Sequence, residues 1–226
     1  MGRGELQFAP TGIPKFLNNF LLKTGFWEIG FYIMQHNRRS IRLQGYDYAS
    51  EGLYFLTICC KDRQHLFGEI RDGEMMLNEV GEIVKESWLE TESIRGNCRI
   101  HEFIIMPNHL HGILEITCFQ NPVMEEKAPN KFISPSGTVG SIVRGFKINA
   151  IKKIREFVGR GEMHFVSSAF GGTEFAPTAL KIKEIDFKIW QRNYYDHIIR
   201  CEESQRKIVH YIQNNPGNWQ EDEYFW

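Results

Sequence analysis

The stretch "CRIHEFIIMPNHLHGILEIT", residues 98–117, carries most of the information that decides the fold. It is rich in apolar and β-branched residues, which is typical of buried strands. Pro107 and Asn108 interrupt it, so the stretch predicts either two short strands or one bent strand. Side chains alternate between the two faces of a strand, so we expect His109 and His111 to share one face. Leu110, Gly112, Leu114 and Ile116 then point the other way, into the core.

The segments on either side predict the remaining elements. A strand is expected where apolar residues fill both alternating faces, and a helix where they recur every three or four residues. By these patterns we expect a strand in 52–70, a helix in 73–94, a helix in 139–158, a short strand with a turn in 187–200, and a last helix in 201–219 that stops at Pro216.

This order of elements predicts an α+β fold. The elements follow one another as strand, helix, strand, strand, helix and strand, with a last helix after them. This order favours a ferredoxin-like sandwich with a central antiparallel sheet and a C-terminal helix. The helices after Gly73 and Val139 are expected on the same sheet face.

The composition of the sequence also divides the chain into segments. We expect an extension in 1–35, the main domain in 36–219 and a tail in 220–226, with a polar loop in 119–140 and an insertion in 159–186.

Bulk properties exclude some classes of protein. The chain has 226 residues and is 42% hydrophobic, which is enough for one domain with a hydrophobic core. Its net charge of −1 does not indicate a strongly basic nucleic-acid-binding protein. Its five cysteines include no CxxC pair and fit a reducing cytoplasm. The start lacks a signal-peptide pattern, and residues 16–34 contain charges that argue against a membrane span. We therefore expect a cytoplasmic protein without a membrane partner.

The histidine pair suggests a metal site. Two neutral imidazoles at i and i+2 of a strand can converge on one cation, but such pairs also occur by chance, so His109 and His111 alone are weak support. A second group lies downstream in "IVHYIQNNP", where Tyr211 and Asn215 are four residues apart and share one helical face with Lys207. An amide oxygen suits Mg²⁺ or Mn²⁺. On spacing alone, the favoured interpretation is a half-buried tyrosine that packs the helix, with Asn and Pro as stop signals.

Four blocks together carry a family resemblance. "HNRRSIRLQGYDY", "MPNHLHG", "TVGSIVRGFK" and "WQRNYYDHIIR" followed by "YIQNNP" resemble the REP-associated tyrosine transposases, a branch of the IS200-like single-tyrosine HUH transposases. The blocks span residues 36–219. The resemblance implies an HUH endonuclease fold and a metal-dependent enzyme, a transposase. Such an enzyme nicks and rejoins single-stranded, hairpin-containing DNA through a 5′-phosphotyrosine.

The resemblance also assigns roles to single residues. His109 and His111 are the implied metal ligands, with Asn215 as third ligand where many IS200-like enzymes have Gln. Tyr211 is the implied nucleophile, and Lys207 would help its phenolate to form. The implied cofactor is Mg²⁺ or Mn²⁺. Related enzymes occur as monomers and as homodimers.

Basic residues near aromatic side chains suggest contacts with DNA, because guanidinium groups bind phosphate and aromatic rings stack on unpaired bases. Arg38, Arg39, Arg42, Arg144 and Lys147 are the candidates.

Other interpretations stay open. The chain could be a domesticated single-stranded DNA-binding protein that has lost its chemistry, or a metal-dependent hydrolase that uses the histidine pair with Glu115. Among the other tyrosines, Tyr194 and Tyr195 compete with Tyr211, but their i+4 neighbours are isoleucines that cannot bind metal.

Overall fold

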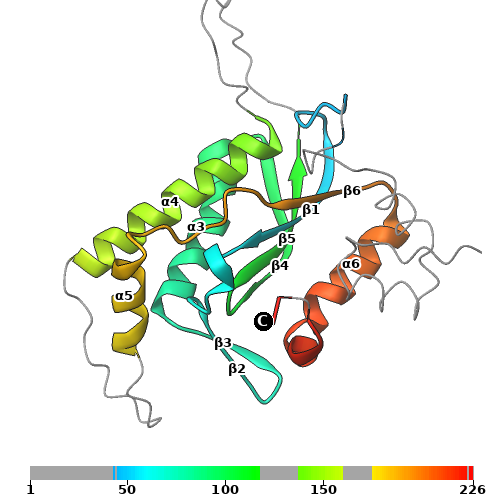
Figure 1. Ribbon diagram of the computed structural model, residues 1–226. Coiled ribbons are helices and arrows are strands. Elements are labelled where there is room, and N and C mark those ends of the chain that lie inside the picture. Colours follow the sequence, from blue (N-terminus) through cyan, green and yellow to red (C-terminus); the bar gives the residue numbers. More distant parts are fainter. Residues whose placement is uncertain (1–42, 44, 118–136, 160–174, 223, 226) are drawn as a thin grey trace, which may run out of the picture.

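A four-stranded antiparallel sheet forms the centre of the protein, seen here in a computed structural model that describes residues 43, 45–117, 137–159, 175–222 and 224–225 (Figure 1). Its strands follow the order β4-β5-β1-β6. The elements are β1 (Gly52–Cys59), η1 (Lys61–Arg63), β2 (Gly68–Arg71), β3 (Glu74–Leu77), α3 (Glu79–Arg95), β4 (Cys98–Met106), β5 (His109–Ile116), α4 (Val139–Gly159), α5 (Phe175–Glu184), β6 (Tyr195–Ile199), α6 (Glu202–Asn214) and η2 (Pro216–Glu221).

The strand order confirms the predicted α+β class. β5 pairs antiparallel with both β4 and β1, and β1 pairs antiparallel with β6. Helix α3 therefore connects β1 to β4 across the inserted strand β5, and α4 connects β5 to β6 across β1. This is the split βαβ arrangement that defines a ferredoxin-like sandwich.

The stretch 98–117 forms two strands joined by a tight turn. Met106 pairs with His109 across the hairpin, and Pro107 and Asn108 make the turn between them. Of the two alternatives left open by the sequence, two short strands is therefore the correct one.

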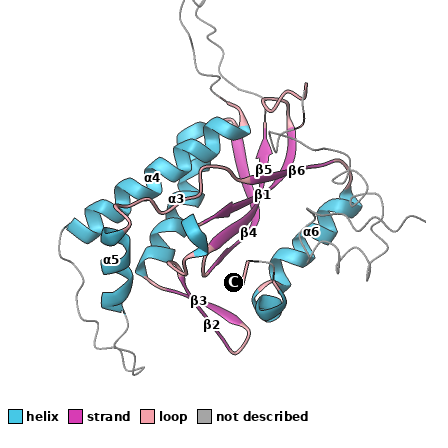
Figure 2. Cartoon of the chain, in the orientation of Figure 1, coloured by secondary structure: helices cyan, strands magenta, loops and turns pink. Residues whose placement is uncertain are grey.

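The two faces of the sheet are covered differently (Figure 2). Helices α3 and α4 lie together on one face, as predicted, and pack on alternate residues of β1 and β5 such as Leu56 and Leu110. Gly112 is on this face, where a Cβ atom would lie only 3.1 Å from the Trp88 ring. Helix α6 covers the opposite face, where Ile212 packs against Ile113. The histidines belong to that second face.

Three predicted boundaries were wrong. The first strand ends at Cys59 rather than near residue 70, and residues 68–77 form the β2–β3 hairpin instead of continuing the strand and beginning the helix. Asp72 and Gly73 make the hairpin turn with φ of 52° and 78°, a conformation that Asp-Gly favours. Helix α3 begins only after Asn78, whose side chain caps it by accepting from the Gly81 amide at 2.9 Å.

Two further predictions fall near gaps in the description. The expected insertion in 159–186 contains helix α5, and residues 160–174 lie outside the described residues. The extension in 1–35 and most of the loop in 119–140 also lie outside them. Within the described ranges, no helix combines the length and the apolar character needed to cross a membrane.

Candidate active site

Strand β5 places His109 and His111 side by side on the sheet face that α6 covers. Both are fully buried, and their ring centroids lie 4.4 Å apart. Phe55, on the neighbouring strand β1, stacks on the His111 ring at 5.4 Å. The two histidines therefore share one face, as the alternation of the strand predicted.

A hydrogen bond to the Nδ1 atom orients each imidazole. Asn108 Oδ1 lies 2.8 Å from His109 Nδ1, and Thr57 Oγ1 lies 2.8 Å from His111 Nδ1. The Asn108 oxygen can only accept, so Nδ1 of His109 carries the proton and Nε2 has a lone pair. That Nε2 atom is buried without a hydrogen-bond partner. A histidine held through one nitrogen with the other left as an acceptor has the arrangement of a metal ligand.

Helix α6 brings the Tyr211 hydroxyl to the histidines. The hydroxyl oxygen lies 3.1 Å from His111 Nε2 and donates to Asp222 Oδ2 at 3.4 Å. The Tyr211 ring packs edge-on against Phe55, with centroids 6.1 Å apart. The predicted juxtaposition of Tyr211 and the histidine strand is therefore present.

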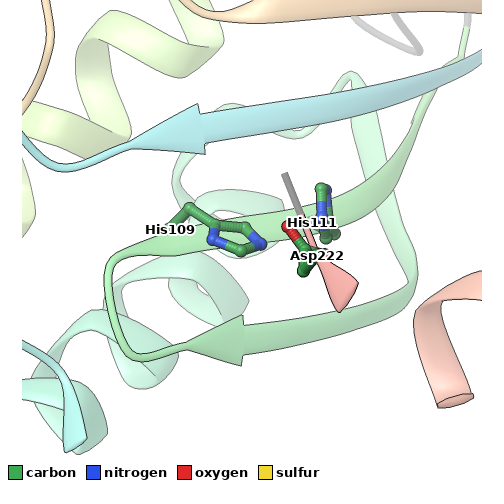
Figure 3. Close-up of side chains that lie close together, drawn as sticks. All are labelled: His109, His111 and Asp222. Atoms are coloured by element: carbon green, nitrogen blue, oxygen red, sulfur yellow. The ribbon is translucent and has the colours of Figure 1, made fainter. Parts of the chain in front are cut away.

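The C-terminal segment completes the cluster with a residue that the sequence did not single out. After Pro216 the chain forms η2, and Asp222 then faces the two histidines (Figure 3). One donor atom from each of His109, His111 and Asp222 lies within 4.8 Å of the others, and all three side chains are buried. Two imidazoles and one carboxylate are a donor set that binds divalent cations. The residues present therefore fit a metal ion.

Asn215 lies in the same site, where its amide contacts Asp222. Its Nδ2 donates to Asp222 Oδ2 at 2.8 Å, and it is 2% exposed. Its Oδ1 is buried without a hydrogen-bond partner among the described residues. Asn215 thus holds the carboxylate that faces the histidines, and its own ligation of the metal stays a prediction.

Burial controls the protonation of the cluster. It lowers the pKa of His111 to about 3 and that of His109 well below its ordinary value, so both imidazoles are neutral and can bind a cation. Burial and the nearby Asp222 raise the pKa of the Tyr211 phenol well above 10. Without a cation, Tyr211 is therefore a protonated phenol and a weak nucleophile.

The lowered histidine pKa values predict acid sensitivity of the metal-free protein. The unfolded chain takes up protons at these histidines near pH 6.5 and the folded chain does not. The stability they contribute is therefore complete above pH 6.5 and is lost as pH falls toward about 3, by about 1.4 kcal/mol per pH unit for each histidine. Urea unfolding between pH 7.5 and 5 measures this slope. His111→Phe should reduce this slope by the contribution of one histidine, about 1.4 kcal/mol per pH unit. An unchanged slope would contradict the assignment.

The comparisons with known proteins give one relative of high identity. The chain is 44% identical over 199 residues to an uncharacterised protein of Haemophilus influenzae, covering 84% of this chain and 94% of that protein. The chain belongs to the same family as that protein. No established family model matches the chain.

Two solved structures are similar at low identity. One is a REP-associated tyrosine transposase bound to a REP hairpin, with a TM-score of 0.43 and 16% identity over 77% of this chain and 73% of that one. The other is a candidate transposase from Deinococcus radiodurans, with a TM-score of 0.39 and 16% identity over 76% of this chain and 95% of that one. Both TM-scores are low, so neither likeness bears on the activity of this chain.

The remaining predicted residues lie outside the cluster. Lys207 is one turn before Tyr211 on α6 and forms an ion pair with Glu203. Arg144 is exposed on α4, across the sheet from the histidines. Lys147, also on α4, donates to the carbonyls of Gln191 at 2.8 Å and Asn193 at 3.4 Å, and burial lowers its pKa to about 8. The roles predicted for these three residues stay predictions.

The other three candidates for DNA contacts, Arg38, Arg39 and Arg42, lie outside the described residues.

The competing residues are also located. Tyr194 packs against the α3–α4 side of the sheet, whereas Tyr195 packs on the histidine side. Tyr224, from the C-terminal segment, was not considered from sequence, yet its ring lies 4.7 Å from the His109 ring. Glu115 is 2.9 Å from His101 Nε2 and is absent from the His109–His111–Asp222 cluster.

Proposed function

We propose that the protein is a metal-dependent transposase that nicks and rejoins single-stranded, hairpin-containing DNA through a covalent bond to Tyr211. One observation carries the proposal: the Tyr211 hydroxyl lies 3.1 Å from His111 Nε2, beside a buried His109–His111–Asp222 cluster that fits a cation. A phenol placed beside a metal site is suited to attack a phosphate whose charge the cation offsets.

The chain's own groups divide the work as follows. His109, His111 and Asp222 would hold a Mg²⁺ or Mn²⁺ ion. The ion would polarise the scissile phosphate and favour the phenolate of Tyr211. Asn108 and Thr57 keep the ligand nitrogens aimed at the site, and Asn215 keeps Asp222 in place.

The transfer step conserves atoms and bond energy. The Tyr211 oxygen attacks phosphorus, the bond from phosphorus to the 3′-oxygen breaks, and the departing 3′-oxygen takes up the proton that the phenol loses. The products are a 5′-phosphotyrosine and a 3′-hydroxyl. Since one phosphodiester replaces another, attack by a second 3′-hydroxyl reverses the step on new DNA without an added energy source.

The sequence blocks that resemble REP-associated tyrosine transposases support the choice of DNA, and the separation of Glu115 from the cluster disfavours the hydrolase interpretation. An inactive DNA-binding protein is the remaining alternative. Incubation with labelled single-stranded hairpin DNA from the flanks of its own gene, with Mg²⁺ or Mn²⁺, separates the two. A covalent adduct on a denaturing gel is expected, and binding without any adduct would favour the inactive protein.

The third ligand can be tested without DNA. Asp222→Asn keeps the size of the side chain but removes its charge, so Mn²⁺ affinity measured by calorimetry should fall by roughly tenfold or more. Asn215→Ala should lower affinity less, because Asn215 acts by positioning Asp222. The reverse order, with Asn215→Ala costing more, would make Asn215 the third ligand.

A further inference from the structure

A cleft of about 710 Å³ lies beside the candidate site. Two chain segments line it, 61–63 after β1 and 188–192 before β6, which run next to each other (Figure 1). Backbone hydrogen bonds join them: Lys61 donates to Ile189 at 2.7 Å, and Gln191 donates to the Cys59 carbonyl at 3.0 Å. Cys59 is also the partner of His109 in the sheet. With about 4.8 Å between strands, the cleft begins about 10 Å from the His109 backbone.

The lining of the cleft is strongly basic. Lys61, Arg63, Lys188 and Arg192 face it, against one carboxylate, that of Asp62. Both lysines have an acidic neighbour, since Lys61 lies 3.9 Å from Asp62 and Lys188 lies 3.4 Å from Asp186. These side chains are about half exposed or more, so such pairs are weak and leave the cleft with excess positive charge.

Arg63 belongs both to the cleft and to the surroundings of the metal cluster. Its carbonyl accepts from Asn108 Nδ2 at 3.2 Å, and Asn108 in turn orients His109. Its guanidinium lies 5.6 Å from the centroid of the Tyr224 ring, which packs on His109. Arg63 therefore connects the cleft to the edge of the cluster.

Both walls of the cleft have unusual backbone. Asp62 and Arg63 have φ of 54° and 52°, and Asp186 and Phe187, directly before Lys188, have φ of 51° and 55°. Left-handed conformation is unfavourable for residues other than glycine, and it persists where the surrounding structure holds it, often at binding sites. Here the strained pairs set the direction of the two basic segments.

We propose that this cleft binds the backbone phosphates of the DNA strand on one side of the scissile phosphate. The choice of ligand rests on the proposed function, because a strand cut at the cluster must leave it across a neighbouring surface. Basic side chains without a shape-specific pocket suit a repeating phosphate backbone and give no base specificity. The cleft would therefore hold the strand in register while Tyr211 reacts.

The test removes two cations that do not touch the cluster. Lys188→Ala with Arg192→Ala is compared with Lys85→Ala and Lys152→Ala, a control that removes a half-buried cation from α3 and an exposed one from α4. Fluorescence anisotropy with a labelled oligothymidylate, in chelator and at several salt concentrations, measures binding. We expect the cleft variant to bind roughly tenfold more weakly, with a slope of log K against log salt that is smaller by about 1.4, or 0.7 for each lost phosphate contact. The control should match the wild type.

A second arm locates the contact. Methylphosphonate substitution neutralises one phosphate at a time in an oligonucleotide carrying the cleaved sequence. At least one substitution on one side of the scissile phosphate should weaken binding to the wild type and have no effect on the cleft variant. Equal affinity and slope for wild type, cleft variant and control would overturn the cleft assignment, as would a wild type that binds no single strand. Failure of the proposed function gives a different result: DNA binding that depends on the cleft, with no covalent adduct at Tyr211.

Discussion

Tyr211→Phe is expected to abolish the covalent protein–DNA adduct while folding and metal binding persist. The substitution removes only the hydroxyl that lies 3.1 Å from His111 Nε2. Loss of a covalent nucleophile lowers the rate by roughly a thousandfold or more. Loss of one hydrogen bond costs only about 1 kcal/mol of stability. Adduct formation on a denaturing gel, urea unfolding and Mn²⁺ calorimetry separate these effects.

Two matched variants serve as controls. Tyr224→Phe removes the hydroxyl of a second tyrosine at the cluster, whose ring packs beside His109, and Tyr195→Phe removes one on the same sheet face. The hydroxyl 3.1 Å from His111 Nε2 is that of Tyr211, so both control variants should retain much of the activity. If Tyr211→Phe kept wild-type adduct formation and Tyr224→Phe lost it, the nucleophile would be Tyr224.

Replacing both histidines, His109→Ala with His111→Ala, is the second change with a large expected effect. It leaves Asp222 as the one described member of the cluster, so Mn²⁺ binding and DNA cleavage should both be lost. Binding of single-stranded DNA should survive in part, because phosphate contacts depend on basic residues elsewhere. The protein should also bind single-stranded DNA more tightly than blunt duplex DNA, and this binding should weaken as the salt concentration rises.

The two histidines are fully buried, so the double variant also leaves cavities and could unfold. Addition of a chelator to the wild-type protein tests the same claim without a substitution. Cleavage that continues in chelator, or in a folded double variant, would contradict a metal role for the histidines.

The sequence was sufficient for the parts of the fold and site that depend on local periodicity. Alternation in residues 109–116 determines which face His109 occupies, and helical spacing after Cys201 places Tyr211 on one helix face. Both patterns are properties of neighbouring residues and need no tertiary information. The order of strands and helices then limited the topology to very few choices.

Other features depended on signals that are weaker or not local. The β2–β3 hairpin was hidden because its apolar residues also fit helical spacing with those of α3, although Asp72-Gly73 marked a turn. Asp222 has no pattern that links it to the histidines. Its position follows from the η2 turn after Pro216 and from the hydrogen bond that Asn215 donates, so only the folded chain reveals it.

Peptide mapping of the trapped adduct tests the central claim most directly. Cleavage by trypsin after Lys207 releases residues 208–226, which contain Tyr211 and Tyr224, whereas Tyr194 and Tyr195 fall in residues 193–200. Fragmentation of the modified peptide then assigns the nucleotide to one tyrosine. We expect a phosphodiester from the 5′-phosphate of the DNA to the Tyr211 oxygen. DNA attached to Tyr194, Tyr195 or Tyr224 would contradict the account.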